Sequence, residues 1–232
     1  MTDLKKIQNR GWWIALIAVA IILVDQILKI WVKTHFYLGE SVEIFSWFHL
    51  AFIQNNGMAF GWEIGSKLML TLLRICAVVF LVYYLWRICG RKEAKTGYLV
   101  CLALVLAGAF GNIIDCVFYG LIFNNPLPPE VASLFPAEGG YGSAFHGLVV
   151  DMLYFPLCDW YWPCWMPWVG GEHFVFFRPV FNIADSAITV GMIAMILFYS
   201  GQVGAVPFLK STQLKADESA AKTDSQDAPD KE

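Results

Sequence analysis

Charged side chains are scarce in this sequence of 232 residues. Asp, Glu, Lys and Arg together make up 15 %, whereas soluble domains contain about 25 %. Hydrophobic residues make up 58 %, above the about 45–50 % of soluble domains. A disordered chain is excluded, and an ordinary soluble enzyme is disfavoured. The formal net charge of −3 also excludes a nucleic-acid binder that depends on a basic face. An integral membrane protein remains.

Several common catalytic motifs are also missing. The sequence has no HExxH zinc motif, no GxSxG nucleophile elbow and no Walker loop. Its four histidines are scattered along the chain. We therefore predict neither a metal site nor a cofactor.

Four apolar stretches are long enough to cross a bilayer as helices, which takes about 20 residues each. They cover about 12–32, 68–88, 98–119 and 183–199. The first is interpreted as a retained helix and not as a signal peptide, because it contains Asp25 and Lys29 and lacks a small-x-small cleavage site.

The distribution of basic residues predicts the orientation. Residues 34–66 contain no Lys or Arg, and residues 120–182 contain only Arg178. Basic residues instead precede the first span, separate the second from the third and follow the fourth: Lys5, Lys6, Arg10, Arg87, Arg91, Lys92, Lys95, Lys210 and Lys215. The positive-inside rule then places both termini in the cytoplasm and the segments 34–66 and 120–182 outside it.

The parts outside the spans differ in character. Residues 34–66 are rich in aromatic and β-branched residues, which predicts short strands that end in a turn at Asn56-Gly57. The Trp- and Tyr-rich stretch 160–168 is typical of a segment at the membrane surface. Residues 1–209 are expected to form a single membrane-embedded domain, followed by a disordered cytoplasmic tail, 210–232.

Two cysteines, Cys158 and Cys164, belong to the outer segment 120–182, where disulfides can form. A bridge between them is one interpretation. A metal site that combines them with His173 is disfavoured, because no recognisable ligand spacing is present.

An ionisable group in or beside a membrane span costs free energy, so each such residue is a candidate for a structural or functional role. Asp25 and Lys29 are four residues apart on one helix face, which predicts a structural ion pair. Gly108, Asn112 and Asp115 form one stripe on the third span. Gly108 permits close helix approach and Asn112 an interhelical hydrogen bond, so a polar packing seam is the simplest interpretation of this stripe.

Two further aspartates lie in contrasting surroundings. Asp185 falls in the first turn of the fourth span, where the helix N-terminus favours the ionised form, and Asn182 can cap that helix. Asp151 has apolar neighbours in LVVDMLYF, which favour the protonated form. Such a contrast is typical of an acid–base pair. The alternative is that Asp185 is only a cap and Asp151 only a surface group.

Five motifs stand in order along the chain, and together they resemble the lipoprotein signal peptidase family, also called signal peptidase II. They are VDQILK at 24–29, QNNGMAFG at 54–61, GNIID at 111–115, VVDM at 149–152 and FNIADSAITVG at 181–191. The resemblance extends from about residue 12 to about residue 200.

The resemblance implies a bacterial membrane aspartic endopeptidase that cleaves prolipoproteins before a diacylglyceryl-modified cysteine. Asp151 and Asp185 would be its catalytic dyad. The other matching positions, which would support the site or bind substrate, are Asn55, Gly57, Gly108, Asn112, Asp115, Asn182 and Ala184, beside the pair Asp25 and Lys29. The implied fold is an all-α membrane protein with four transmembrane helices and both termini in the cytoplasm. Outside the cytoplasm it would have a small β-cradle from residues 34–66 and a helix or loop insertion, including a mobile outer helix, from the segment 120–182.

The resemblance also implies a setting. The enzyme would lie in the bacterial cytoplasmic (inner) membrane, with its active site at the extracytoplasmic face. It would act as a monomer, without a cofactor, and globomycin-type cyclic peptides would inhibit it.

Two departures from the family pattern stand out. The family usually has Arg directly after the aspartate of GNxxD, whereas this sequence has Cys116, and Arg178 is one candidate for a replacement. The outer stretches 120–146 and 156–178 are also longer than usual.

Two other classes of membrane protein, a small transporter and a scaffold, are alternatives. Intramembrane Asp, Lys and Asn residues also mark ion pathways in small transporters, and they can serve as structural contacts in a scaffold. Four spans without a visible inverted repeat argue against a transporter.

Overall fold

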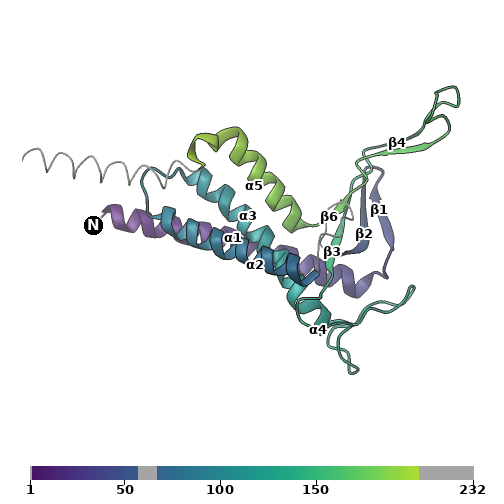
Figure 1. Ribbon diagram of the computed structural model, residues 1–232, viewed down its shortest axis with the longest axis horizontal. Helices are drawn as coiled ribbons and strands as arrows, with labels where there is room; N and C mark the ends of the chain where they lie inside the picture. Colours follow the sequence, from purple (N-terminus) through teal and green to yellow (C-terminus); the bar gives the residue numbers. More distant parts are fainter. Residues whose placement is uncertain (1, 57–66, 204–232) are drawn as a thin grey trace, which may run out of the picture.

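Four long helices lie side by side in the computed structural model, which describes residues 2–56 and 67–203 (Figure 1). They are α1 (Thr2–His35), α2 (Lys67–Cys89), α3 (Thr96–Ile114) and α5 (Ile183–Tyr199). Helix α3 continues through a π-helical turn, η2 (Asp115–Tyr119), into the short α4 (Gly120–Ile122), and a 3-10 turn, η3 (Ser200–Gln202), follows α5. The predicted turn residue Gly57 and the predicted tail 210–232 lie outside the described residues.

The helices confirm the four predicted spans. The stretches that are long and apolar enough to cross a membrane are Arg10–His35, Lys67–Cys89, Thr96–Ile122 and Ile183–Gln202. Large apolar side chains remain exposed on all four, including Trp12, Leu73, Phe110 and Leu197. Exposed apolar faces of this kind are stable against lipid, where each helix satisfies its own backbone hydrogen bonds.

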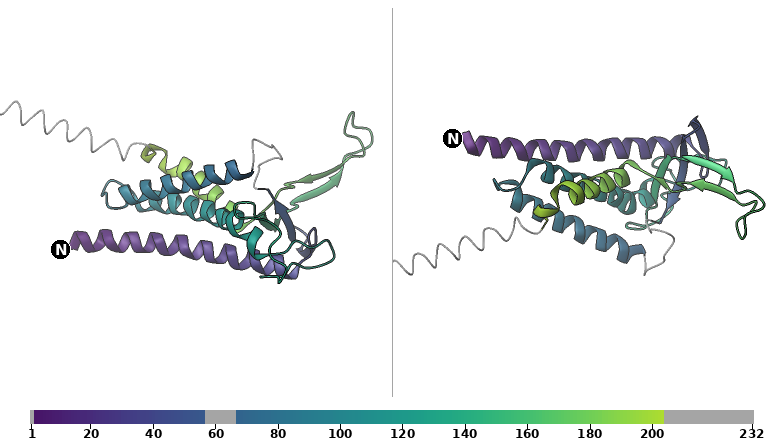
Figure 2. Two further views of the ribbon diagram at one scale, coloured as in Figure 1. Left: turned by 60° about the horizontal axis from the view of Figure 1, so that its bottom comes forward. Right: turned by 90° about the horizontal axis from the view of Figure 1, so that it is seen from above.

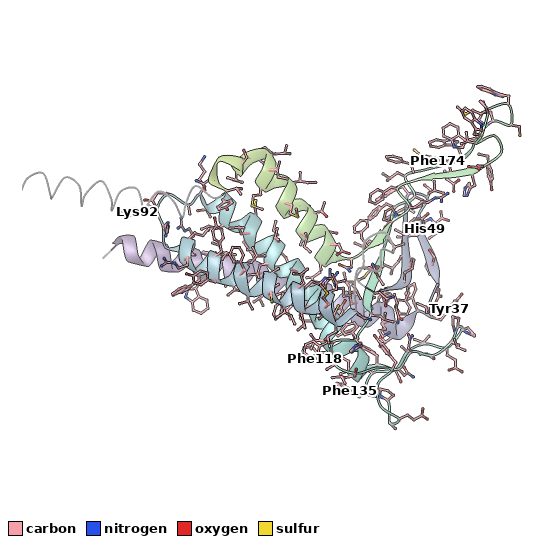
Figure 3. All side chains as sticks on the ribbon, in the orientation of Figure 1. Tyr37, His49, Lys92, Phe118, Phe135 and Phe174 are labelled. Atoms are coloured by element: carbon pink, nitrogen blue, oxygen red, sulfur yellow. The ribbon has the colours of Figure 1, made fainter. Side chains whose placement is uncertain are left out.

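The two ends of the helix group are different. The N-terminus, the turn after α2 that contains Lys92 and the end of α5 gather at one end, while the strands gather at the other (Figures 1–3). Arg10 ties the first end together, because it donates hydrogen bonds to the carbonyl oxygens of Cys89, Arg91 (2.8 Å) and Ala94 (3.0 Å). This fits the predicted clustering of basic residues, whereas the side of the membrane that this end faces stays a prediction.

A four-stranded antiparallel sheet has the strand order β1-β2-β3-β6. Its strands are β1 (Ser41–Phe45), β2 (Phe48–Asn55), β3 (Val149–Tyr154) and β6 (Val180–Phe181). The sheet therefore draws on both outer segments, whereas the sequence predicted strands only in 34–66. Residues 149–152 of β3 are buried, so this strand lies in the core of the sheet region.

The outer helix expected in 120–182 is not formed: the only helix that begins in this segment is α4, which continues the third span. The segment holds Pro126, Pro128, Pro129 and Pro136, which break helices, and many aromatic residues, which favour strands. It forms instead an extended stretch and a separate hairpin of β4 (Cys158–Tyr161) and β5 (His173–Phe176). The fold is thus four helices with two small antiparallel sheets, and not all-α in its outer part.

An apolar cluster joins the sheet to the helices. It contains Val32 of α1 and Phe36 directly after this helix, Phe52 of β2, Tyr119 and Phe123 near α4, and Val150 and Met152 of β3. Lys33 lies inside this cluster with its Nζ 5.3–5.4 Å from the ring centres of Phe52, Phe123 and Tyr141. The cluster holds β3, and with it Asp151, against the C-terminal end of α1 and against η2.

Candidate active site

Asp151 is positioned by the pairing of β2 with β3. Ile53 faces Asp151 and Asn55 faces Val149 in the register, so Asn55 and Asp151 are diagonal neighbours on one face of the sheet. Asn55 Nδ2 donates a hydrogen bond to Asp151 Oδ2 at 3.1 Å. The Asp151 side chain is buried, at 3 % exposed. Burial, reinforced by the negative charge of Asp185, raises its pKa to about 7.

Asp185 is positioned by the first turn of α5. Asn182 is the N-cap, and its side-chain oxygen accepts a hydrogen bond from the Asp185 backbone N–H at 2.9 Å. Asp185 Oδ2 in return accepts one from the Asn182 backbone N–H at 3.4 Å, which completes a capping box. The half-buried carboxylate therefore sits at the positive end of the helix dipole, which stabilises negative charge.

Two asparagines connect the two aspartates. Asn182 Nδ2 donates to Asp151 Oδ1 at 2.7 Å, and Asn112 Nδ2 donates to Asp185 Oδ1 at 2.8 Å. The asparagines also contact each other, from Asn182 Nδ2 to Asn112 Oδ1 at 3.3 Å. The structure thus places Asp151 and Asp185, from a strand and a helix, at the two ends of one hydrogen-bonded group.

Lys29 lies beneath this group with its ammonium surrounded by three acceptors. Its Nζ lies 2.8 Å from Asp25 Oδ2, 2.7 Å from Asp115 Oδ2 and 2.8 Å from Asn112 Oδ1. All three N–H bonds of the ammonium are therefore used. The predicted pair Asp25–Lys29 is present, but it belongs to a larger network, since Asp115 joins it and Lys29 orients Asn112.

The same network fixes the start of α5. Asp25 Oδ1 accepts a hydrogen bond from the Ala184 backbone N–H at 2.9 Å. Asp115 Oδ2 is 3.4 Å from the backbone N–H of Val150, the residue before Asp151. The carboxylates of Asp25 and Asp115 are completely buried, so these contacts are made away from water. They hold the backbone of the residues directly before Asp185 and Asp151.

Gln26 belongs to the site although sequence reasoning did not select it. Its Nε2 donates to Asp115 Oδ1 at 2.9 Å and lies 3.2 Å from both Asp25 Oδ2 and the Gly111 carbonyl oxygen. Its Oε1 accepts from the Tyr119 hydroxyl at 3.1 Å. The available signal was its place inside the motif VDQILK, directly after Asp25.

Close contact between α3 and α5 depends on Gly108. A Cβ atom at this position would lie 2.2 Å from the carbonyl oxygen of Ala184. Only glycine allows the two backbones to approach in this way. One turn further along α3, Asn112 can then reach Asp185.

Cys116 stands next to a guanidinium group from another helix. Arg74 Nη1 of α2 is 3.6 Å from the Cys116 sulfur. Arg178, which the sequence offered as a replacement for the arginine of the family pattern, instead donates to the His173 carbonyl oxygen at 3.1 Å near the β4–β5 hairpin. The cation beside position 116 therefore comes from α2, and the expectation for Arg178 was wrong.

Cys158 and Cys164 are both free, so the bridge considered from the sequence is not formed. Cys158 begins the extended strand β4, whose last residue is Tyr161, and each strand residue advances the chain by about 3.3 Å. The strand therefore carries the chain along the hairpin, away from Cys158, before Cys164 is reached. Within the described residues, no group of three or more His, Cys, Asp or Glu side chains is placed to hold a metal ion.

Comparisons with known proteins agree with this geometry. The family pattern of signal peptidase (SPase) II matches residues 17–200. The lipoprotein signal peptidase of Porphyromonas gingivalis is 49 % identical over 190 residues, which cover 82 % of this chain and 84 % of the relative. That of Amoebophilus asiaticus is 36 % identical over 195 residues, covering 82 % and 78 %.

Two solved structures have a similar fold. Two structures described as a bacterial membrane enzyme, determined by the in meso method, align with a TM-score of 0.52 and 26 % sequence identity. The alignments cover 79 % and 87 % of this chain and 90 % of each solved chain. The chain belongs to the signal peptidase II family of membrane aspartic proteases.

Proposed function

We propose that this protein removes signal peptides from prolipoproteins by hydrolysing the peptide bond before the diacylglyceryl-modified cysteine. Its relatives are named lipoprotein signal peptidases, and its four apolar helices suit a substrate that is anchored in the bilayer. Membership of a protease family favours this function over the transporter and scaffold interpretations.

One observation carries the mechanism: Asp151 and Asp185 are held by the same pair of asparagines but lie in opposite environments. Asp151 is buried and its pKa is raised to about 7. Asp185 lies at a helix N-terminus with donors to both of its oxygens. Two nearby carboxylates can share one proton, and we propose that Asp151 holds it, because burial and the negative charge of Asp185 raise its pKa to about 7.

The proposed reaction is general acid–base hydrolysis without a covalent intermediate. The Asp185 carboxylate takes a proton from a water molecule, whose oxygen attacks the carbonyl carbon of the scissile bond. Asp151, protonated, donates a hydrogen bond to the carbonyl oxygen, where negative charge develops. The proton on Asp185 then passes to the leaving nitrogen as the C–N bond breaks, which releases the lipid-modified cysteine with a free amino group.

The surrounding network orients the dyad. Lys29 fixes the Asn112 side chain, which donates to Asp185, and Asn182 donates to Asp151. These residues are proposed to position the carboxylates and to leave their remaining oxygen lone pairs free for water and substrate.

Substrate selectivity is proposed to come from the lipid. Each CH₂ group that stays in the bilayer contributes roughly 0.8 kcal/mol to membrane binding. A diacylglyceryl anchor can therefore distinguish lipid-modified from unmodified precursors. We place the site at the extracytoplasmic face of the bacterial inner membrane, because the basic residues gather at the other end of the helices. We further propose a monomer that globomycin-type cyclic peptides inhibit.

The test is a gel-shift cleavage assay in detergent with the purified enzyme. A prolipoprotein is supplied with and without its diacylglyceryl group, and Asp151→Asn and Asp185→Asn variants are run in parallel. We expect cleavage only of the lipidated precursor and only by the wild-type enzyme. Equal cleavage of both precursors would refute the lipid-based selectivity, and wild-type rates in either variant would refute the dyad.

A further inference from the structure

The β4–β5 hairpin stands apart from the rest of the protein. It projects from the sheet end, away from the helices, and Phe174 lies on this arm (Figures 1 and 3). The two strands form a sheet of their own, which pairs with no strand of the four-stranded sheet. We call residues 158–176 the aromatic hairpin. An isolated two-stranded hairpin is marginally stable in water, so its apolar surface needs a partner.

The aromatic hairpin has two unlike faces. Cys158 pairs with Phe176 and Trp160 with Phe174, so these four residues share one face. The rings of Trp160 and Phe174 are 4.5 Å apart, and Trp162 joins them at 5.4 Å from Trp160. This aromatic face remains open: Trp160 is 38 % exposed and Phe176 is 53 % exposed.

The opposite face is polar. Asp159 and Tyr161 lie there together with Val175 and His173 of the neighbouring strand. His173 Nε2 is 2.5 Å from Asp159 Oδ1, and its ring stacks on Tyr161 at 4.7 Å. An antiparallel sheet with one apolar and one polar face normally covers the apolar face and leaves the polar face in water.

The tip extends the aromatic surface. Trp165 is 79 % exposed and Trp168 is 97 % exposed. Trp168 also has a φ of 68°, a left-handed conformation that is unfavourable for a bulky residue. The loop around it is nevertheless held by backbone bonds from Gly170 N–H to Met166 O (3.0 Å) and from Gly171 N–H to Trp162 O (2.9 Å). A defined backbone thus presents the largest side chains outward.

The chemistry of this surface identifies its partner. No Asp, Glu, Lys or Arg occurs between Trp160 and Gly171, so no charge would be desolvated if this stretch were covered. Its large side chains are mostly Trp and Tyr, which combine an apolar ring with a polar N–H or O–H and concentrate where lipid headgroups meet hydrocarbon. A protein core would favour Leu, Ile and Val, which hardly occur here.

The base of the hairpin lies near that boundary. Its base adjoins β6, where Phe177 and Phe181 have ring centres 5.9 Å apart, and α5 begins at Ile183. The arm is therefore anchored within seven residues of the first turn of a membrane helix, on the same helix that contains Asp185. We infer that the aromatic hairpin docks its Trp160/Phe174 face and its Trp165–Trp168 tip into the headgroup region of the surrounding phospholipid bilayer, beside the active site.

The hairpin supplies its own labelling site, because Cys164 is exposed at the tip. The full-length enzyme, with Cys76, Cys89 and Cys158 replaced by Ser, is labelled at Cys164 with an environment-sensitive fluorophore. It is then placed in phospholipid nanodiscs that contain a headgroup-level quencher lipid. The matched control carries Cys164→Ser and the same fluorophore at Glu138→Cys, an exposed position on the other outer loop.

We expect the probe at Cys164 to be blue-shifted and quenched several-fold more than the probe at residue 138. Trp165→Ser with Trp168→Ser should return it to the level of the control. Equal quenching at the two positions would overturn the proposal, and so would quenching that appears only after a lipidated precursor is added, since the hairpin would then bind substrate. The readout is independent of cleavage, so this inference and the proposed function fail separately.

Discussion

Asn112 and Asn182 contact each other at 3.3 Å, and each donates a hydrogen bond to a different aspartate of the site. Asn112 lies near the C-terminal end of α3, and Asn182 is the N-cap of α5. Their contact couples the position of Asp185 to that of Asp151. A substitution of either asparagine should therefore shift the positions of both carboxylates.

Asn182 has two separable tasks, which predicts different effects for two substitutions. Asn182→Ser keeps a side-chain oxygen that can cap α5 but cannot reach Asp151, whereas Asn182→Ala loses both contacts. Both variants should cleave at least about 100-fold more slowly, as expected when a general acid is misplaced. Only the alanine variant should also be less stable, because loss of an N-cap lowers the free energy of unfolding by about 1 kcal/mol. Cleavage rates and unfolding in detergent measure the two effects, and an active serine variant would contradict the role of the amide.

Activity should fall as the pH rises through about 7. In the proposed reaction Asp151 must hold a proton to act as the acid, and its pKa is raised to about 7, so deprotonation above this pH would remove the active form. The hydrogen bond from Asn55 lowers this pKa, because it stabilises the carboxylate. Asn55→Ala should therefore move the alkaline limb of kcat to higher pH.

The control for this prediction is Gln54→Ala. Gln54 is the neighbouring residue of β2 and hydrogen-bonds Asn125 at 2.8 Å, away from the dyad. Its pH profile should match that of the wild type. An alkaline limb that stays in place in Asn55→Ala would show that another group controls it.

Lys29→Met should cost much more stability than Lys33→Met. The first substitution leaves the buried carboxylates of Asp25 and Asp115 without their cation, a loss of about 3–5 kcal/mol. Lys33 has no hydrogen-bond partner among the described residues and contacts aromatic rings, so methionine can replace most of its contacts. Chemical unfolding in detergent compares the two variants. Similar losses of unfolding free energy would contradict the role of Lys29 as the counter-ion of Asp25 and Asp115.

Gly108→Ala should separate α3 from α5. The added methyl group would meet the Ala184 carbonyl oxygen, and relief of such overpacking costs about 1–3 kcal/mol and moves Asn112 away from Asp185. Gly11→Ala is the matched control, because its new Cβ would have only an ordinary contact of 3.6 Å with the Cys89 sulfur. Cleavage should drop in the first variant and persist in the second. Equal activities would show that the helices can shift without harm.

Arg74→Gln should weaken substrate binding. The guanidinium of Arg74 lies beside Cys116, at the position where the family pattern places an arginine of its own. We expect a higher KM with a smaller change in kcat, and partial recovery in the double variant Arg74→Gln with Cys116→Arg. Thermal unfolding of both variants provides the control for folding. A wild-type KM in Arg74→Gln would show that the cation at this position is dispensable.

Local properties of the sequence were sufficient to predict the apolar spans and to select the aspartates as candidate site residues. The apolar stretches that predicted the helices are continuous in sequence, and the cost of an ion in a membrane singles out Asp25, Lys29 and Asp115 without knowledge of the fold. Capping also depends on neighbours in sequence, so Asn182 and Asp185 were recognisable as a helix start.

Contacts between residues that are far apart in the sequence could not be predicted from the sequence alone. Gln26 was overlooked because its partners Asp115 and Tyr119 lie on another helix. Arg74 was overlooked and Arg178 favoured because sequence distance does not reveal which guanidinium lies beside Cys116. The prediction of an outer helix was wrong, because the prolines and aromatic residues of the segment 120–182 favour extended structure.

The sequence by itself determined which stretches are long and apolar enough to cross a membrane and which ionisable residues are candidates for the chemistry, because both are properties of short segments. Only the tertiary structure decided how Asp151, from a strand, and Asp185, from a helix, come to share one pair of asparagines. That arrangement depends on strand register and on the close approach of α3 to α5. Both are set by packing between residues far apart in the chain.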